Sequence, residues 1–247
     1  TSSIGGGLRV FSGTLTLDSV TVTNNRALSA NAGLGGGIMA DGEARLIVSN
    51  STISDNVAAV SGGGLNVRAP AEAGIVNSII RGNRAPSGAG LEGNSPAYVL
   101  SETILENNIA SVRGGAALLF GGKFTQTGGA MRNNYAGRSG GGAMNLITDA
   151  EIALTNVAIT GNRADTAGNG GAIAASGNAL LTITGGSMSG NRASVVGGGL
   201  ALSSGRPSSL TNVNVTDNEA GSGGGGLFIA ASANLTVTGG AISSNRA

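Results

Sequence analysis

The stretch Ile53-Ser54-Asp55-Asn56-Val57-Ala58, followed by Gly62-Gly63-Gly64-Leu65, recurs nine times along the chain with some drift. Every copy has an asparagine with an alanine two residues later, and these asparagines are Asn25, Asn56, Asn83, Asn108, Asn134, Asn162, Asn191, Asn218 and Asn245. The eight intervals between them average 27.5 residues, and the last residue of each glycine-rich tetrad lies 17 or 18 residues before its asparagine. A repeat with such a fixed internal spacing predicts a solenoid in which every copy forms one rung.

Apolar residues alternate with polar ones inside each copy. The position three residues before the asparagine is apolar every time, as Val22, Ile53, Ile80, Leu105, Met131, Ile159, Met188, Val215 and Ile242. The positions eight and ten residues before it are mostly apolar, and the alternation resumes after the tetrad. A spacing of two predicts strands with one buried face, and no stretch shows a helical period. We therefore expect an all-β fold, a parallel β-helix of about nine rungs of about 27 residues with three short strands per rung.

The nine asparagines are expected to form a structural ladder at a corner of the rod. An asparagine tolerates left-handed backbone conformation at a tight turn, and side-chain amides stacked in register can bond to one another along the rod. The alanine after each asparagine suits a corner with little room, and the glycine pairs are expected to supply turns with positive φ. This interpretation assigns the repeated asparagines to the fold and not to a ligand.

Composition excludes several classes of function. Lys plus Arg number 14 against 13 Asp plus Glu, a net charge of +1, so no field attracts nucleic acid or an anionic membrane. The chain has no cysteine and no histidine, so it lacks disulfides, thiolate metal sites and the commonest general base. It has no apolar run of about 18 residues, and we expect no membrane insertion by this segment. Residues 1–247 are interpreted as one continuous β-helix domain, a fragment of a longer solenoid without its polar caps.

The charged residues fall mostly into pairs on adjacent rungs. Arg81, Glu106 and Arg132 occupy one column of three successive rungs, and the same logic pairs Arg45 with Glu72 and Lys123 with Glu151. Cross-strand pairs of this kind are expected to stabilise the register. Gln126 interrupts an otherwise apolar column, so its buried amide must find a partner.

The remaining carboxylates are scattered, and none is expected to face another at the separation that a glycosidase needs. The connections between rungs are short, which argues against a deep cleft. Gly88-Ala89-Gly90-Leu91-Glu92-Gly93 matches the dinucleotide-binding fingerprint, but it opens a strand where that fingerprint needs a helix. The sequence therefore predicts no catalytic residue, no cofactor site and no metal site.

The repeats resemble those of polymorphic outer membrane proteins. The motifs that carry this resemblance are Gly-Gly-Ala-Ile at 170–173 and the tetrapeptides Val22-Thr23-Asn24-Asn25 and Met131-Arg132-Asn133-Asn134. They are similar as well to the repeats of bacterial surface β-helix proteins of pectate-lyase-like architecture. The resemblance covers essentially the whole chain. It implies a right-handed β-helix that is extracellular or displayed at the cell surface, often as an adhesin or autotransporter passenger.

Three functions remain open at this point. The first is a non-enzymatic structural or adhesive solenoid whose partner is another protein or a glycan surface. The second is a carbohydrate-active β-helix, a polysaccharide lyase or hydrolase or its scaffold, because this fold hosts both kinds of protein. The third is a self-assembling filament or surface-layer subunit, in which the rods associate head to tail through their end strands.

Overall fold

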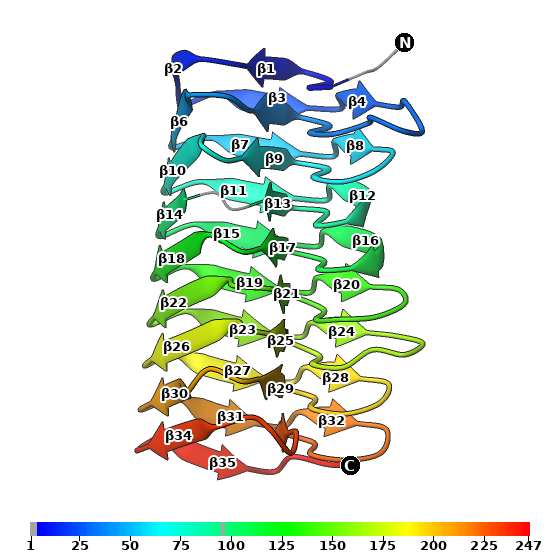
Figure 1. Cartoon of the computed structure of the whole chain (residues 1–247), viewed down its shortest axis with the longest axis vertical. Helices are drawn as coiled ribbons and strands as arrows, with labels where there is room; N and C mark the ends of the chain where they lie inside the picture. Colours follow the sequence, from blue (N-terminus) through cyan, green and yellow to red (C-terminus); the bar gives the residue numbers. More distant parts are fainter. Residues whose placement is uncertain (1–3, 95–96) are drawn as a thin grey trace.

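Nine rungs stack into a straight rod in the computed structural model, which describes residues 4–94 and 97–247 (Figure 1). Every strand pairs in parallel with its counterparts on the neighbouring rungs, so the strands form flat ladders that run the length of the rod. The described residues contain no helix, and hence none that could cross a membrane. The expected all-β parallel solenoid of about nine rungs is confirmed.

Four sheets make up the rod, and Figure 1 labels most of their strands. The first sheet contains β1 (Leu8–Val10), β5 (Ile38–Ala40), β9 (Leu65–Arg68), β13 (Leu91–Asn94), β17 (Ala117–Phe120), β21 (Met144–Ile147), β25 (Ile173–Gly177), β29 (Leu200–Ser204) and β33 (Leu227–Ile229). The second contains β2 (Gly13–Asp18), β6 (Ala44–Ser49), β10 (Glu72–Val76), β14 (Ala97–Ser101), β18 (Lys123–Thr127), β22 (Glu151–Thr155), β26 (Leu180–Thr184), β30 (Ser208–Thr211) and β34 (Leu235–Thr238).

The third and fourth sheets lie on either side of the asparagine. The third contains β3 (Thr21–Thr23), β7 (Thr52–Ser54), β11 (Ile79–Arg81), β15 (Ile104–Glu106), β19 (Ala130–Arg132), β23 (Ala158–Thr160), β27 (Ser187–Ser189), β31 (Asn214–Thr216) and β35 (Ala241–Ser243). The fourth contains β4 (Arg26–Ala27), β8 (Val57–Ala58), β12 (Arg84–Ser87), β16 (Ile109–Arg113), β20 (Tyr135–Ala136), β24 (Arg163–Ala164), β28 (Arg192–Ala193) and β32 (Glu219–Ala220).

The fourth sheet is an addition to the three strands per rung expected from the sequence. Most of its strands are only two residues long, such as Val57–Ala58 and Arg163–Ala164. Two residues are too few to show an alternating pattern, because that pattern is recognised over four to eight residues. The sequence therefore predicts the three longer strands and misses the shortest one.

The core consists of apolar columns that run along the rod. Ile53 pairs in register with Val22 on one side and Ile80 on the other, and all three are buried. The strands of the second sheet, such as β10 and β18, bury alternate residues, so a slip of one residue would expose a whole column. Tyr98 and Phe124 also follow one another in a column, with ring centroids 6.0 Å apart and planes tilted by 55°.

The corner before the fourth sheet differs from the expectation in one respect. The left-handed residue of each rung stands immediately before the ladder asparagine, with φ between 54° and 63°, as Asn24, Asp55, Gly82, Asn107, Asn133, Gly161, Gly190, Asp217 and Ser244. The proposed left-handed conformation of the ladder asparagine itself is therefore wrong. The preceding residue turns the backbone, and this leaves the asparagine side chain pointing along the rod.

Two positions of the tetrad require glycine, each for a different physical reason. Gly62 has a φ of 63°, which is a backbone conformation that favours glycine. Gly64 has no such φ, but a Cβ atom there would lie 2.6 Å from the carbonyl oxygen of Gly90 and 3.1 Å from Asn83 Nδ2. The first glycine therefore makes the turn, and the third lets the next rung and the ladder approach closely.

Candidate functional site

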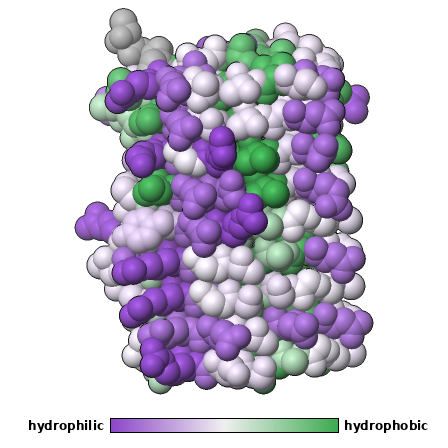
Figure 2. Space-filling view, turned by 180° about the vertical axis from the view of Figure 1, so that it is seen from behind, coloured by the Kyte–Doolittle hydropathy of each residue, from purple (hydrophilic) through white to green (hydrophobic). Residues whose placement is uncertain are grey.

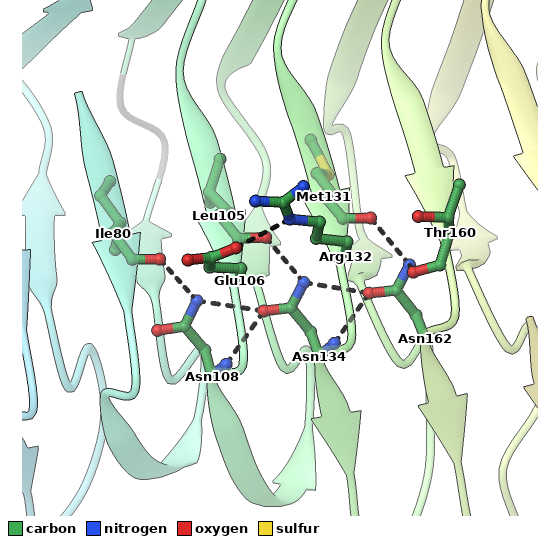
Figure 3. A network of polar contacts seen from close by, with 9 residues as sticks. All are labelled: Ile80, Leu105, Glu106, Asn108, Met131, Arg132, Asn134, Thr160 and Asn162. Atoms are coloured by element: carbon green, nitrogen blue, oxygen red, sulfur yellow. Dashed lines mark hydrogen bonds and ion pairs between the residues drawn. The ribbon is translucent and has the colours of Figure 1, made fainter. Parts of the chain in front are cut away.

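The nine predicted ladder asparagines form one continuous row of hydrogen bonds. Asn134 Nδ2 and the Asn134 backbone N–H both donate to Asn162 Oδ1 at 2.9 Å, and Asn162 Nδ2 donates to Asn191 Oδ1 at 2.9 Å. Asn162 Nδ2 also donates to the carbonyl oxygen of Met131 on the previous rung at 2.9 Å (Figure 3). The same pattern runs from Asn25 to Asn245, so the predicted ladder is confirmed.

The hydrogen-bonding capacity of the ladder is filled by the protein itself. An interior member such as Asn162 is fully buried, and its Oδ1 atom accepts two hydrogen bonds while its Nδ2 atom donates to neighbouring rungs. A side-chain amide with every polar atom paired has nothing left to offer a ligand. The ladder therefore holds the rungs in register and is not a binding site.

Some of the predicted charge pairs form ion pairs and others do not. Arg132 Nε lies 2.7 Å from Glu106 Oε2, and Lys123 Nζ lies 3.7 Å from Glu151 Oε2. Arg81 is in register with Glu106, and Arg45 with Glu72, yet neither of these pairs is among the ion pairs within 4.0 Å of the described residues. Figure 2 looks onto the molecule from the side opposite Figure 1, where hydrophilic residues gather near the middle of the rod beside a small hydrophobic area. These pairs lie at the surface and stabilise the register.

The buried Gln126 finds a partner, as expected. Its Nε2 atom donates to the carbonyl oxygens of Thr103 at 2.9 Å and Gly128 at 3.2 Å. Its Oε1 atom has no partner. The amide thus replaces an apolar side chain by bonding to the corner between the second and third sheets.

The outer face of the first sheet, nearest the viewer in Figure 1, is partly covered. Asn66 and Glu92 point outward from β9 and β13, one residue after the inward Leu65 and Leu91, yet they are 1% and 8% exposed. The segments that follow the fourth-sheet strands lie against this face. Ser61, for example, accepts a hydrogen bond from Asn66 Nδ2 at 3.0 Å.

Two open hollows lie on this face. The Glu92 hollow has a volume of about 540 Å³, and its lining includes Arg68, Glu92, Asn94, Phe120 and Asp149. The Asn145 hollow has a volume of about 300 Å³, and its lining includes Arg113, Asn145, Asn169, Ser176, Ser203 and Phe228. Both hollows are open to solvent, so they do not contradict the expectation that short connections build no deep cleft.

A cluster of three buried polar side chains lies beside the hollows: Glu92 lines the first hollow, Arg113 lines the second, and Asn66 is in register with Glu92. Glu92 Oε2, Asn66 Oδ1 and Arg113 Nε are each buried without a hydrogen-bond partner. The Arg113 guanidinium lies over the Phe120 ring, 5.3 Å from its centroid, so each hollow contributes one member of this stacked pair. Three unpaired buried atoms in one place distinguish this cluster from the fully paired ladder.

Burial raises the pKa of Glu92 to about 7. Hydrogen bonds from Ser61 and Asn66, and the charges of Arg68 and Arg113, act in the opposite direction but are weaker than the effect of burial. A carboxyl group with this pKa exchanges its proton near neutral pH. Asp149 lines the same hollow, so two carboxyl groups from different rungs face one open space.

The sequence did not indicate this cluster. Glu92 and Asp149 are 57 positions apart and were assigned to scattered carboxylates, because the column of Glu92 does not repeat as a charged column. One signal was available, since Asn66 and Glu92 occupy equivalent positions on successive rungs directly after the tetrad. No group of three or more carboxylates that could hold a metal ion occurs among the described residues.

Comparison with known proteins agrees with the fold. The profile of the family described as "Right handed beta helix region" matches residues 1–126, just over half of the chain. No curated protein and no solved structure matches the chain. The rungs beyond residue 126 repeat the same four-sheet arrangement as those before it. The chain belongs to the right-handed β-helix family.

Proposed function

We propose that this chain is a non-enzymatic adhesive β-solenoid, displayed on or secreted from a bacterial cell, that binds another surface with the outer face of its first sheet. The observation that supports this proposal is the pair of hollows on that face, with buried polar atoms that the protein leaves unpaired. Binding sites are typically concave and carry a few convergent polar groups. The ladder on the far side of the core gives this face a rigid support.

Rigidity matters for an adhesin because a preformed surface loses little conformational freedom when it binds. Each rung is fixed to the next by four sets of backbone hydrogen bonds and by the amide row. The rigid rungs also hold the two hollows at a fixed distance, so a partner can contact both at once. Two weak contacts then add up to stable attachment.

The test is attachment of the purified chain to surfaces. Residues 1–247 are immobilised and exposed to panels of glycans and of extracellular matrix proteins, with binding followed by biolayer interferometry. We expect saturable binding to at least one member of the panels. The absence of binding to every member, at protein concentrations up to the millimolar range, would contradict the adhesive function.

A second candidate, a carbohydrate-active enzyme, is supported by one observation. Glu92 and Asp149 share a hollow, and the pKa of Glu92 lies near the value that suits a general acid at neutral pH. Its test is the release of reducing or unsaturated ends from acidic and neutral polysaccharides. Turnover by the chain that disappears in both Glu92→Gln and Asp149→Asn would establish this candidate in place of the adhesive one.

A further inference from the structure

The outer face of the second sheet carries an apolar hollow on its first rungs. Gly74 of β10 lies in register between Ile47 of β6 and Val99 of β14, so it leaves a gap one rung wide in a column of apolar side chains. The hollow at this gap has a volume of about 420 Å³. Val76 and Val99 in its lining are 48% and 58% exposed. An apolar side chain from another molecule can therefore enter the gap.

Two opposite charges border this hollow without neutralising each other. Arg45 of β6 and Glu72 of β10 are exposed and in register. They form no ion pair within 4.0 Å in the part of the chain that the structure describes, whereas Lys123 and Glu151 further along the same column do. A partner that places a carboxylate over Arg45 and a cation over Glu72 would use both charges.

A second copy of the chain meets this requirement in one arrangement. Two rods lie face to face and antiparallel, related by a twofold axis that runs parallel to the strands, between β6 and β10. This axis exchanges the two rungs and keeps the position along the strand, so each residue of β6 faces the residue of the other copy's β10 with which it is in register. Arg45 therefore faces Glu72 of the other copy at two equivalent places, and Ile47 enters the gap at Gly74.

The neighbouring residues continue this match. Val76 faces the smaller Ser49, and the same axis sets β2 against β14, so Thr16 faces Val99 and Asp18 faces Ser101. No like charges face each other in these pairs. Sheet faces about 10 Å apart pack well when a large side chain meets a small one. Figure 1 shows the projecting loops on the side of the fourth sheet, away from the second sheet, so they do not obstruct the approach.

We infer that two copies of this chain associate, in antiparallel orientation, through the first four rungs of the second sheet. This interface lies on a different face from the proposed adhesive surface and does not depend on the adhesive function. Strands of five residues such as β10, on four rungs, cover roughly 300 Å² in plan for each copy. An interface of this size belongs to the weak, transient class.

Sedimentation equilibrium of residues 1–247, from about 10 μM to about 1 mM, measures the association. We expect a monomer–dimer equilibrium within this range. Arg45→Glu and Glu72→Arg each place like charges opposite each other at both contacts, so each is expected to weaken the Kd at least tenfold. An equimolar mixture of the two variants sets opposite charges against each other at both contacts, and it is expected to restore the Kd of the unmodified chain. Mixing cannot restore a variant that has lost its fold.

The gap at Gly74 gives a second, uncharged test. Gly74→Leu fills the space that Ile47 of the other copy enters, and its Cβ atom meets nothing within 4 Å in its own chain. We expect the Kd to weaken at least tenfold while the melting midpoint of the monomer is kept. Ala153→Leu is the matched control, because Ala153 lies in the same column on β22, outside the four rungs. Its Kd is expected to equal that of the unmodified chain.

Three results would overturn this inference. The first is a chain that remains monomeric up to about 1 mM. The second is a dimer that Gly74→Leu leaves unchanged, or a loss of association that mixing Arg45→Glu with Glu72→Arg does not restore, because the contact would then lie on another face. The third is growth beyond the dimer into filaments, which would show that the rods associate head to tail through their end strands.

Discussion

The asparagine corner and the outer face of the first sheet both bury polar side chains, but they treat them differently. At the corner, Asn134 and Asn162 pair every polar atom of their side chains within the ladder. On the outer face, Asn66, Glu92 and Arg113 each leave one buried atom without a partner. Asparagine therefore has every polar side-chain atom hydrogen-bonded at the corner, but one unpaired side-chain atom on the outer face.

This difference is one of free energy. A paired buried amide stabilises the fold by a modest amount, whereas each unpaired buried group costs roughly 1–3 kcal/mol. A repeat protein can remove such a cost by placing an apolar residue on that rung, as Leu118 does beside Glu92. The three unpaired atoms of this cluster are the observation on which the proposed binding role rests.

Breaking the ladder is expected to have the largest effect on stability. Asn162→Ala removes the acceptor of Asn134 N and Nδ2 and the donor to Met131 O and Asn191 Oδ1. We expect a loss of about 4 kcal/mol in the free energy of unfolding, measured by urea denaturation. Asn214→Ala, at an exposed position of β31, is the control and should change stability by less than about 0.5 kcal/mol. Equal midpoints for the two variants would show that the ladder does not carry stability.

The unpaired cluster is expected to make stability depend on pH. The pKa of Glu92 is raised by burial to about 7 in the folded chain from an ordinary value of 4.5, so the folded state holds the proton more tightly than the unfolded state. This tighter proton binding stabilises the folded state by up to roughly 3 kcal/mol. The stabilisation is fully present below pH 4.5 and is lost as the pH rises through about 7. Thermal unfolding between pH 4.5 and 8 measures it.

Glu92→Gln is the matched variant for this pH dependence. Its melting midpoint should stay level over the same range, because glutamine does not titrate. The chain has no histidine, so the usual titrating side chain of this range is missing. Asp18, Glu151 and Asp165 have lowered pKa values, caused first by hydrogen bonds, and their contributions are lost only at lower pH. A slope that persists in Glu92→Gln would show that another group is responsible.

The close approach of glycines beneath the ladder is expected to have an intermediate effect. Gly64→Ala would place a Cβ atom 2.6 Å from the Gly90 carbonyl oxygen, so the two rungs must separate locally. We expect a loss of about 2 kcal/mol. Gly74→Ala is the control, because a Cβ atom there meets nothing within 4 Å and Gly74 lies inside a strand, where alanine is favoured by roughly 0.5–1 kcal/mol. Opposite signs of the two changes are the expected result.

The surface ion pair of Glu106 and Arg132 is expected to have the smallest effect. The Arg132 side chain is 47% exposed, so solvent screens the 2.7 Å contact. Arg132→Met should cost less than about 1 kcal/mol at low ionic strength, and the difference should vanish in 1 M salt. A larger cost that salt does not reduce would assign Arg132 a packing role instead.

Much of this fold could be predicted because the same pattern of buried and exposed positions recurs on all nine rungs. The apolar residue three positions before Asn83 identifies an inward column, and the repeated asparagine identifies the ladder. The register of Glu106 with Arg132 also follows from counting positions. The register does not predict whether the two charged side chains make contact. Arg45 and Glu72 are in register but form no ion pair, because long side chains can extend to solvent instead.

The cluster around Glu92 could not be predicted in the same way, because it depends on what lies over the sheet. Position in the repeat marks Glu92 as outward, which ordinarily means exposed, yet Ser61 and Arg113 from the adjoining rungs cover it. These contacts depend on the path of the segments after the fourth sheet. Those segments vary in length from rung to rung and have no alternating pattern.

The sequence by itself determined the solenoid, its period, its buried columns and the asparagine ladder. Each of these follows from a pattern that recurs in every copy of the repeat, and stacking in register places equivalent residues in one column. Only the tertiary structure decided which outward residues are covered, where the two hollows lie and which polar atoms remain unpaired. Burial of an outward residue such as Glu92 depends on neighbours from other rungs, and the pKa of its carboxyl group is raised to about 7 only once they are in place.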